Sequence, residues 1–284
     1  MDALYKTLIE NGYISLTVIE TTKIVNKAIK FHKLTPLTAA GLGRTMTASL
    51  FMASNLKNKG DRLSVTICGN GVGGHIIVSA DSNLNVRGYI DNPHVNLPLK
   101  PNGKLDVTGL GGDGRLTVIK SMGLKEPYTG SSKIISGEIA EDFAYYYTVS
   151  EQTPTAMALG VKVNGKGVCV GAGGVIMQVM PGCSEEAIAR AESIISNFSN
   201  VSTIIERIGA ENLCKEYFKG SEFTKYEVKY KCVCSKRYID NVITSLGIKE
   251  AQSIIDEQGK IEVGCQYCNK TYVYTQEDIE KLFK

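Results

Sequence analysis

Four of the eight cysteines form two close pairs near the C-terminal end of the chain, and these pairs constrain its fold more than any other feature. Cys232 and Cys234 have one residue between them, and Cys265 and Cys268 have two. Residues 235–264 separate the pairs. Two tight pairs far apart in sequence are typical of a tetrahedral zinc site, because each short loop supplies two thiolates and folding joins the loops. The sequence therefore predicts one zinc ion held by four cysteines.

The three histidines, His32, His75 and His94, all lie in the first third of the chain. We therefore expect four sulfur ligands and no open coordination position, which is typical of a structural or switchable metal rather than a catalytic one. The alternative is that four free thiols share the C-terminal segment by chance. The other cysteines stand alone in the sequence: Cys68, Cys169, Cys183 and Cys214. We expect these four to pack as small buried hydrophobic side chains.

The N-terminal residues 1–13 mix charged and apolar positions, and they contain no basic segment followed by an apolar one. No secretory signal is predicted, and we expect a cytoplasmic protein, in which clustered cysteines more often bind metal than form structural disulfides. The chain has 32 Lys and Arg against 29 Asp and Glu, a net charge too small to argue for nucleic acid or a membrane surface as a partner. No apolar run approaches the roughly 20 residues of a membrane span.

Residues 1–179 are predicted to form a large α+β domain that mixes sheet and helix. Alternating apolar and polar residues predict strands at 13–18 and from 63 onward, and more strands at 156–179. Thr35 followed by Pro36 predicts the N-cap and first residue of a helix that continues to Met52. Strands interrupted by helices are typical of the α+β class.

Residues 180–230 are predicted to be a helical linker region, with one amphipathic helix beginning after Ser184 and a second over 201–219. Residues 231–284 are predicted to form a small domain with two helices, two strands beside the second cysteine pair, and a final helix capped by Thr275. So short a domain has a thin core, and a bound metal commonly compensates for this.

The sequence contains no zincin motif, nucleophile elbow or phosphate-binding loop, so we predict no catalytic residues and no enzymatic activity. A thiol–disulfide oxidoreductase is a weaker alternative, because no βαβ pattern surrounds Cys265 and Cys268. A permanent structural zinc module in a nucleic-acid-associated protein is a second alternative. Half of the fourteen tyrosines lie in residues 211–284, where they could stack on bases, but that segment carries as many acidic as basic residues.

Over essentially its whole length the chain resembles the 33 kDa chaperonin family of redox-regulated heat-shock holdases. Besides the two cysteine pairs, the resemblance rests on segments of the first domain: Val86–Tyr89, Asn92-Pro93, Leu97–Leu99, Gly103–Val107, Gly123–Tyr128, Ser136–Asp142, Ser150–Pro154 and Ala172–Gly174. It implies an ATP-independent cytoplasmic chaperone that binds unfolding proteins under oxidative and heat stress, with no nucleic acid or membrane as partner. It also implies an inactive reduced form that holds zinc.

On oxidation, the resemblance implies disulfides between Cys232 and Cys234 and between Cys265 and Cys268, with release of zinc, dimerisation and capture of clients. Elementary energetics support the same scheme. Structural zinc contributes roughly 10–16 kcal/mol to a small module, whereas a core this small contributes only about 3–5 kcal/mol. We therefore hypothesise that loss of zinc unfolds the tail, destabilises the helices of 180–230 and exposes their apolar faces.

Overall fold

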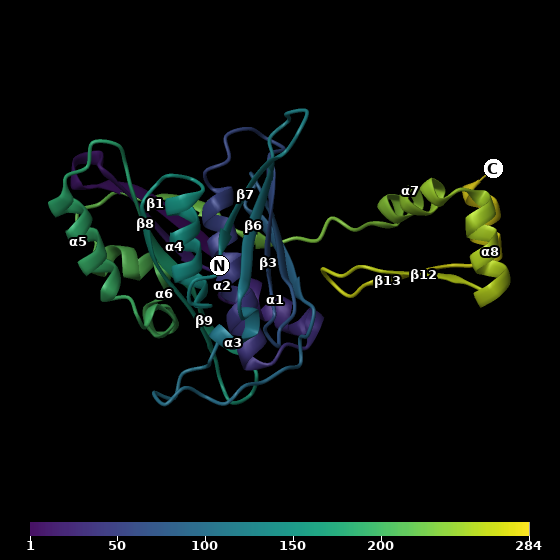
Figure 1. Ribbon diagram of the computed structural model, residues 1–284, viewed down its shortest axis with the longest axis horizontal. Helices are drawn as coiled ribbons and strands as arrows, with labels where there is room; N and C mark the ends of the chain where they lie inside the picture. The colour runs from purple at the N-terminus through teal and green to yellow at the C-terminus, as the bar shows by residue number, and fades with distance from the viewer. Residues whose placement is uncertain (284) are drawn as a thin grey trace. The chain divides into compact units, whose positions relative to one another are not determined.

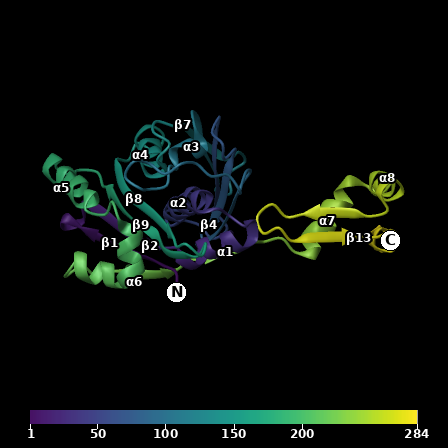
Figure 2. The ribbon, with the colours of Figure 1, turned by 90° about the horizontal axis from the view of Figure 1, so that it is seen from below.

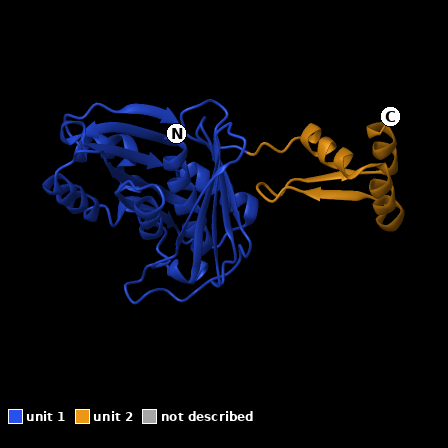
Figure 3. Cartoon of the chain, turned by 45° about the horizontal axis from the view of Figure 1, so that its top comes forward, with its two compact units in different colours: residues 1–231 blue, residues 232–284 orange. Residues whose placement is uncertain are grey.

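The computed structural model describes residues 1–283 and divides the chain into two compact units, residues 1–231 and residues 232–284 (Figure 3). Among residues 1–283, no helix combines the length and the apolar character that crossing a membrane requires. The predicted α+β class is confirmed, because the first unit mixes two sheets with helices and the second pairs a hairpin with three helices.

The first unit contains two mainly antiparallel sheets. Sheet A has the strand order β10-β1-β2-β9-β8, with β10 at Thr224–Glu227, β1 at Ala3–Ile9, β2 at Ile14–Glu20, β9 at Cys169–Val179 and β8 at Thr155–Val163. Sheet B has the order β11-β5-β4-β3-β6-β7, with β11 at Lys229–Tyr230, β5 at Asn85–Ile90, β4 at Ile76–Asp81, β3 at Arg62–Gly69, β6 at Gly114–Ser121 and β7 at Tyr128–Lys133. In sheet B, β11 alone pairs parallel to its neighbour.

Helix α2 (Pro36–Ala53) lies between the two sheets and contacts strands of both (Figure 2). Every residue of α2 except Pro36 and Arg44 is buried, as expected for a helix with a sheet on each side. At Gly43 a Cβ atom would come within 2.8 Å of Val25 and Val161, so glycine permits this close approach. The Thr35 side chain accepts a hydrogen bond from the Thr38 N–H, which confirms the predicted N-cap.

The remaining helices of this central layer are α1 (Thr22–His32), α3 (Thr108–Gly111) and α4 (Ile139–Val149), and the 3₁₀ turn η1 (Glu10–Gly12) joins β1 to β2. Helix α4 packs against β7 of sheet B and β8 of sheet A. Together the inner faces of both sheets, α1, α2 and α4 enclose one continuous hydrophobic core.

Helices α5 (Glu185–Ser196) and α6 (Val201–Tyr217) pack on the face of sheet A opposite α2 (Figure 1). The buried side chains Phe198, Val201 and Ile205 meet Leu16 and Val175 of the sheet in a second hydrophobic cluster. The segment expected to be a helical linker, 180–230, thus contains both expected helices and continues into β10 and β11, the edge strands of sheets A and B. The segment lies within the first compact unit.

The second unit contains helices α7 (Lys236–Leu246), α8 (Ile248–Gln258) and α9 (Gln276–Leu282) and the hairpin of β12 (Ile261–Gly264) with β13 (Thr271–Tyr274). A capping box formed by Thr275 and Asp278 begins α9, as the sequence predicts. The hydrophobic core of the second unit consists of a few side chains: Ile239, Ile243, Ala251, Ile255, Ile261, Tyr272, Tyr274 and Ile279. The unit therefore has little apolar burial of its own to hold it together.

Candidate metal centre

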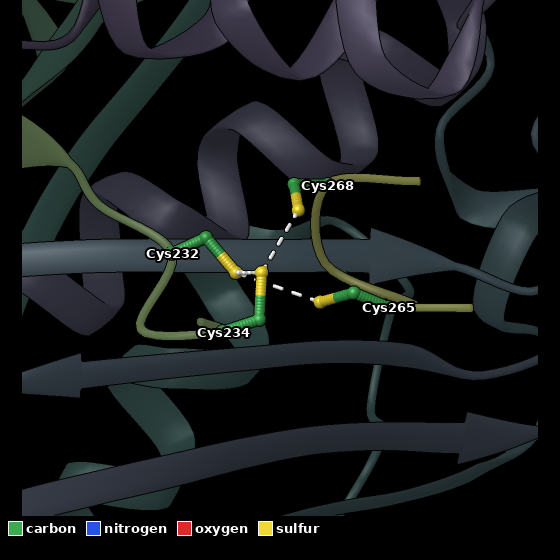
Figure 4. Close-up of side chains that lie close together, drawn as sticks. All are labelled: Cys232, Cys234, Cys265 and Cys268. Carbon is green, nitrogen blue, oxygen red and sulfur yellow. Dashed lines mark hydrogen bonds between the residues drawn. The ribbon is translucent and has the colours of Figure 1, made fainter. Parts of the chain in front are cut away.

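The four paired cysteines converge on one point in the second unit, where their sulfur atoms lie within 4.8 Å of one another (Figure 4). The Sγ of Cys232 lies 3.3 Å from that of Cys234 and 3.5 Å from that of Cys265, and the Sγ of Cys234 lies 3.4 Å from that of Cys268. All four residues are half-buried. We call this group the sulfur cluster.

The sulfur cluster has the dimensions of a tetrahedral zinc site. Zinc–sulfur bonds of about 2.3 Å in a tetrahedron place the sulfur atoms about 3.8 Å apart, close to the separations in the cluster. Four thiolates this close together repel one another, and a bound divalent cation offsets that repulsion. The cluster can therefore hold a metal ion, and its all-sulfur ligand set is compatible with zinc.

The first cysteine pair lies immediately before helix α7. The N-cap residue of this helix is Ser235, whose hydroxyl accepts a hydrogen bond from the Tyr238 N–H. Cys234 therefore lies next to a helix N-terminus, where the exposed N–H groups and the helix dipole favour a thiolate over a thiol. The local sequence thus positions these two sulfur atoms and favours the charged form of Cys234.

The second cysteine pair lies in the tight loop that joins β12 to β13. The Cys265 N–H donates to the Lys270 carbonyl at 2.9 Å, and the carbonyl of Cys265 accepts from the Asn269 N–H at 2.8 Å. Asn269 adopts a left-handed conformation with φ 53°, which asparagine tolerates better than most residues. This turn directs the sulfur atoms of Cys265 and Cys268 toward the first pair.

The acidities within the sulfur cluster are unequal. Burial raises the pKa of Cys234, but hydrogen bonds from neighbouring side chains outweigh that effect and lower its pKa to about 7. Burial raises the pKa of Cys232, and burial and the neighbouring thiols raise that of Cys268. Without a metal, Cys234 therefore becomes a thiolate more readily than Cys232 or Cys268.

The four isolated cysteines lie elsewhere in the fold. Cys169 and Cys214 are buried as expected, and burial raises the pKa of each thiol to about 12. Cys183 is half-buried. The expectation is wrong for Cys68, which is exposed. Alternate residues of β3 point to opposite faces, so Leu63, Val65 and Ile67 point into the core and Cys68 points outward.

The residues that secure the chain immediately before the sulfur cluster could not be recognised from the sequence. Val228 and Tyr230 are both buried in the first unit. Tyr230 is one of the two residues of β11, and Val228 lies immediately before this strand. Their only sequence signal is the alternation of Val228 and Tyr230 with the charged residues Lys229 and Lys231.

Comparisons with known proteins agree on one family. The family model described as Hsp33 protein matches residues 2–275. A protein of Acetivibrio thermocellus named 33 kDa chaperonin is 40% identical over 100% of this chain and 97% of its own length. Another of that name from Bacillus velezensis is 40% identical, over 99% of this chain and 98% of its own.

A solved structure agrees with these matches. The crystal structure of the 33 kDa chaperonin, or heat shock protein 33 homolog, of Thermotoga maritima is 33% identical and superimposes with a TM-score of 0.90. The similarity covers 99% of this chain and 97% of that one. The chain therefore belongs to the Hsp33 family.

Proposed function

We propose that this protein is an ATP-independent holdase chaperone of the cytoplasm that binds unfolding proteins under oxidative and heat stress. Its relatives carry the name 33 kDa chaperonin, which supports a chaperone rather than an enzyme. The reduced form holds one zinc ion on Cys232, Cys234, Cys265 and Cys268 and is inactive. Oxidation activates the protein.

The observation that carries this proposal is that all four sulfur atoms belong to a unit with very little core. Bound zinc would supply two positive charges that hold the four thiolates together, a contribution of roughly 10–16 kcal/mol. The small core contributes only about 3–5 kcal/mol. The order of the second unit thus depends on the thiolate state of its cysteines.

Oxidation converts the thiolates that would hold zinc into disulfides. Two thiolates, Cys232 and Cys234 or Cys265 and Cys268, give up two electrons and form one disulfide. One peroxide molecule accepts these electrons with two protons and leaves as two water molecules. After two such steps the cluster has lost four negative charges and no longer holds zinc, so the second unit loses its main source of stability.

Activation then spreads to helices α5 and α6 through the chain segment that connects them to the second unit. These helices cover an apolar face of sheet A that includes Leu16 and Val175. Ion pairs hold the helices at their rim, between Arg190 and Glu10 and between Lys162 and Glu206. When the helices leave, both their own apolar faces and the sheet face are available to unfolding proteins and to a second copy of the chain, which accounts for a homodimer in the oxidised form.

The test is to treat zinc-loaded protein with peroxide at a mildly raised temperature and to measure zinc release and suppression of client aggregation together. We expect both to rise in parallel, and we expect Cys183→Ser, outside the sulfur cluster, to behave as wild type. Zinc retention without suppression would favour a permanent structural module. Catalytic turnover of a disulfide substrate would favour an oxidoreductase.

A further inference from the structure

Strand β11 is held on the edge of sheet B by its backbone. It pairs parallel to β5, with Lys229 opposite Asn85 and Tyr230 opposite Val86. The Lys229 N–H donates to the Leu84 carbonyl at 3.1 Å, and the Lys231 N–H donates to the Val86 carbonyl at 3.0 Å. Backbone hydrogen bonds of this kind accept any side chains that fit, so the outer edge of β5 can pair with other extended segments.

One aromatic side chain anchors this strand. Tyr230 is 5% exposed, and its hydroxyl donates to the Gly88 carbonyl at 3.2 Å. Its ring meets the Phe31 ring edge-on, with 5.4 Å between centroids. The Lys27 Nζ donates to the Tyr230 carbonyl at 3.1 Å and lies 5.9 Å from both ring centroids. The site therefore combines a backbone edge with a single aromatic pocket.

The strand that occupies this site is short and ends close to the sulfur cluster. β11 has two residues, and only Lys231 separates it from Cys232. A strand this short gains little from pairing and depends on the anchoring side chains Val228 and Tyr230. Disorder in the second unit removes the fixed end of the chain at Cys232 and thereby lowers the cost of detaching β11.

We propose that β11 is an internal occupant of a peptide-binding edge, and that the outer edge of β5 takes an extended client segment carrying an aromatic residue once β11 has left. The client backbone pairs with Leu84 and Val86 as a parallel strand, and its aromatic ring fills the pocket between Phe31 and Lys27. This inference rests on the proposed holdase function, because it names where an unfolding protein binds.

The test uses full-length, zinc-loaded protein and a fluorescent peptide with the sequence of residues 226–231, Tyr-Glu-Val-Lys-Tyr-Lys. Tyr230→Ala removes the anchor and leaves the four cysteines unchanged. The matched control is Tyr226→Ala, since Tyr226 is 44% exposed. Fluorescence anisotropy should show that the peptide binds Tyr230→Ala at least about tenfold more tightly than wild type or Tyr226→Ala. In the latter two proteins β11 occupies the edge, and the apparent affinity is reduced to the extent that few edges are open.

A second measurement needs no mutation and covers the case in which Tyr230→Ala misfolds. Oxidised wild-type protein should bind the same peptide, and amide exchange should show new protection at Val86 and Gly88. A peptide with alanine in place of its second tyrosine should bind at least about tenfold more weakly, because it cannot fill the aromatic pocket. Equal affinity for the two peptides, or binding without protection of β5, would overturn the proposal.

The two proposals fail in different ways. If the oxidised protein suppresses client aggregation but the peptide neither binds nor protects β5, the edge is not the site and the holdase function stands. If the peptide binds and protects β5 but the oxidised protein does not suppress aggregation, the edge stands as a peptide site and the holdase function is wrong.

Discussion

Tyr230 and Cys232 are separated by one residue, yet Tyr230 is anchored on the edge of sheet B in the first unit and Cys232 belongs to the sulfur cluster of the second. The last residue of the first unit and the first metal-ligand candidate are thus covalent neighbours. Under the proposed redox function, a change in the sulfur cluster would act directly on the end of the chain that carries β11 and, further upstream, α6. This short connection gives a physical route from thiol chemistry to the packing of the first unit.

Removing one sulfur ligand should unfold the second unit while the sheet core of the first unit, including β3, keeps its fold. We expect Cys265→Ser to lower bound zinc from one ion per chain to near zero, since the affinity of a closed site falls steeply with three thiolates. Amide exchange should then show loss of protection at Ile239 and Ile243 and no change at Leu63 or Val65 in β3. Cys183→Ser is the matched control, and a zinc content equal to that of wild type in Cys265→Ser would contradict the assignment.

Much of the second unit could be predicted from sequence because its signals are local. Gly247 and Gly259 end helices α7 and α8, a common role of glycine, and Thr275 caps α9 as expected. The spacing of the cysteine pairs predicts their convergence for the same reason, since each short loop brings two sulfur atoms together. These features depend on a few neighbouring residues and not on the rest of the fold.

The elements that were missed depend on distant partners. Strand β1 at Ala3–Ile9 shows no clear alternation, because its first three residues, Ala3, Leu4 and Tyr5, are all buried. It pairs with β2 on one side and with β10, distant in the sequence, on the other. Strand β11 is too short for any periodic signal, and β5, more than 140 residues earlier, determines where it pairs. The same dependence explains Cys68, whose exposure is set by the register of β3.

Glu138→Gln should destabilise the first unit without affecting zinc. The Arg44 Nη1 and the Lys100 Nζ donate to the two carboxylate oxygens of Glu138 at 2.8 and 2.6 Å. Burial lowers the pKa of Arg44, and the Glu138 carboxylate opposes that shift. Breaking a fully buried pair costs about 3–5 kcal/mol, and because Glu138 is 31% exposed we expect roughly 2 kcal/mol.

Chemical denaturation would measure this loss, and Glu141→Gln provides the control because Glu141 is an exposed carboxylate in the first turn of α4, the helix that Glu138 precedes as N-cap. Equal denaturation midpoints for the two variants would show that the Arg44 pair contributes nothing. Zinc content should match wild type in both.

The stability of the first unit should depend on pH through Asp2. Burial raises the pKa of Asp2 to about 6, although its carboxylate accepts hydrogen bonds from the backbone N–H groups of Lys23 and Ile24. An unfolded aspartate has a pKa near 4, so between about pH 4 and 6 the folded chain holds a proton that the unfolded chain has lost. The free energy of unfolding should therefore fall by on the order of 2–3 kcal/mol as the pH rises through that range, and stay level above it.

Asp2→Asn should remove this slope. The quantity to compare is the difference between wild type and variant at each pH, because release of zinc in acid affects both proteins equally. A difference that does not vary between pH 4.5 and pH 7 would exclude Asp2 as the titrating group.

Loosening α5 and α6 should activate the chaperone without oxidation. Phe198, at the turn between the two helices, is 1% exposed, stacks on Phe218 and packs in the cluster that covers sheet A. Phe198→Ala removes that packing and leaves a cavity, a loss of about 3–5 kcal/mol for a fully buried phenylalanine. Since this loss falls on the contact between the helices and the sheet, we expect zinc-loaded Phe198→Ala to suppress client aggregation under reducing conditions. Glu192→Ala, an exposed change in α5, should stay inactive until oxidised. If Phe198→Ala loses protection in α5 and α6 by amide exchange yet remains inactive, exposure of this apolar surface is not sufficient for client binding, and the activating event lies elsewhere in the chain.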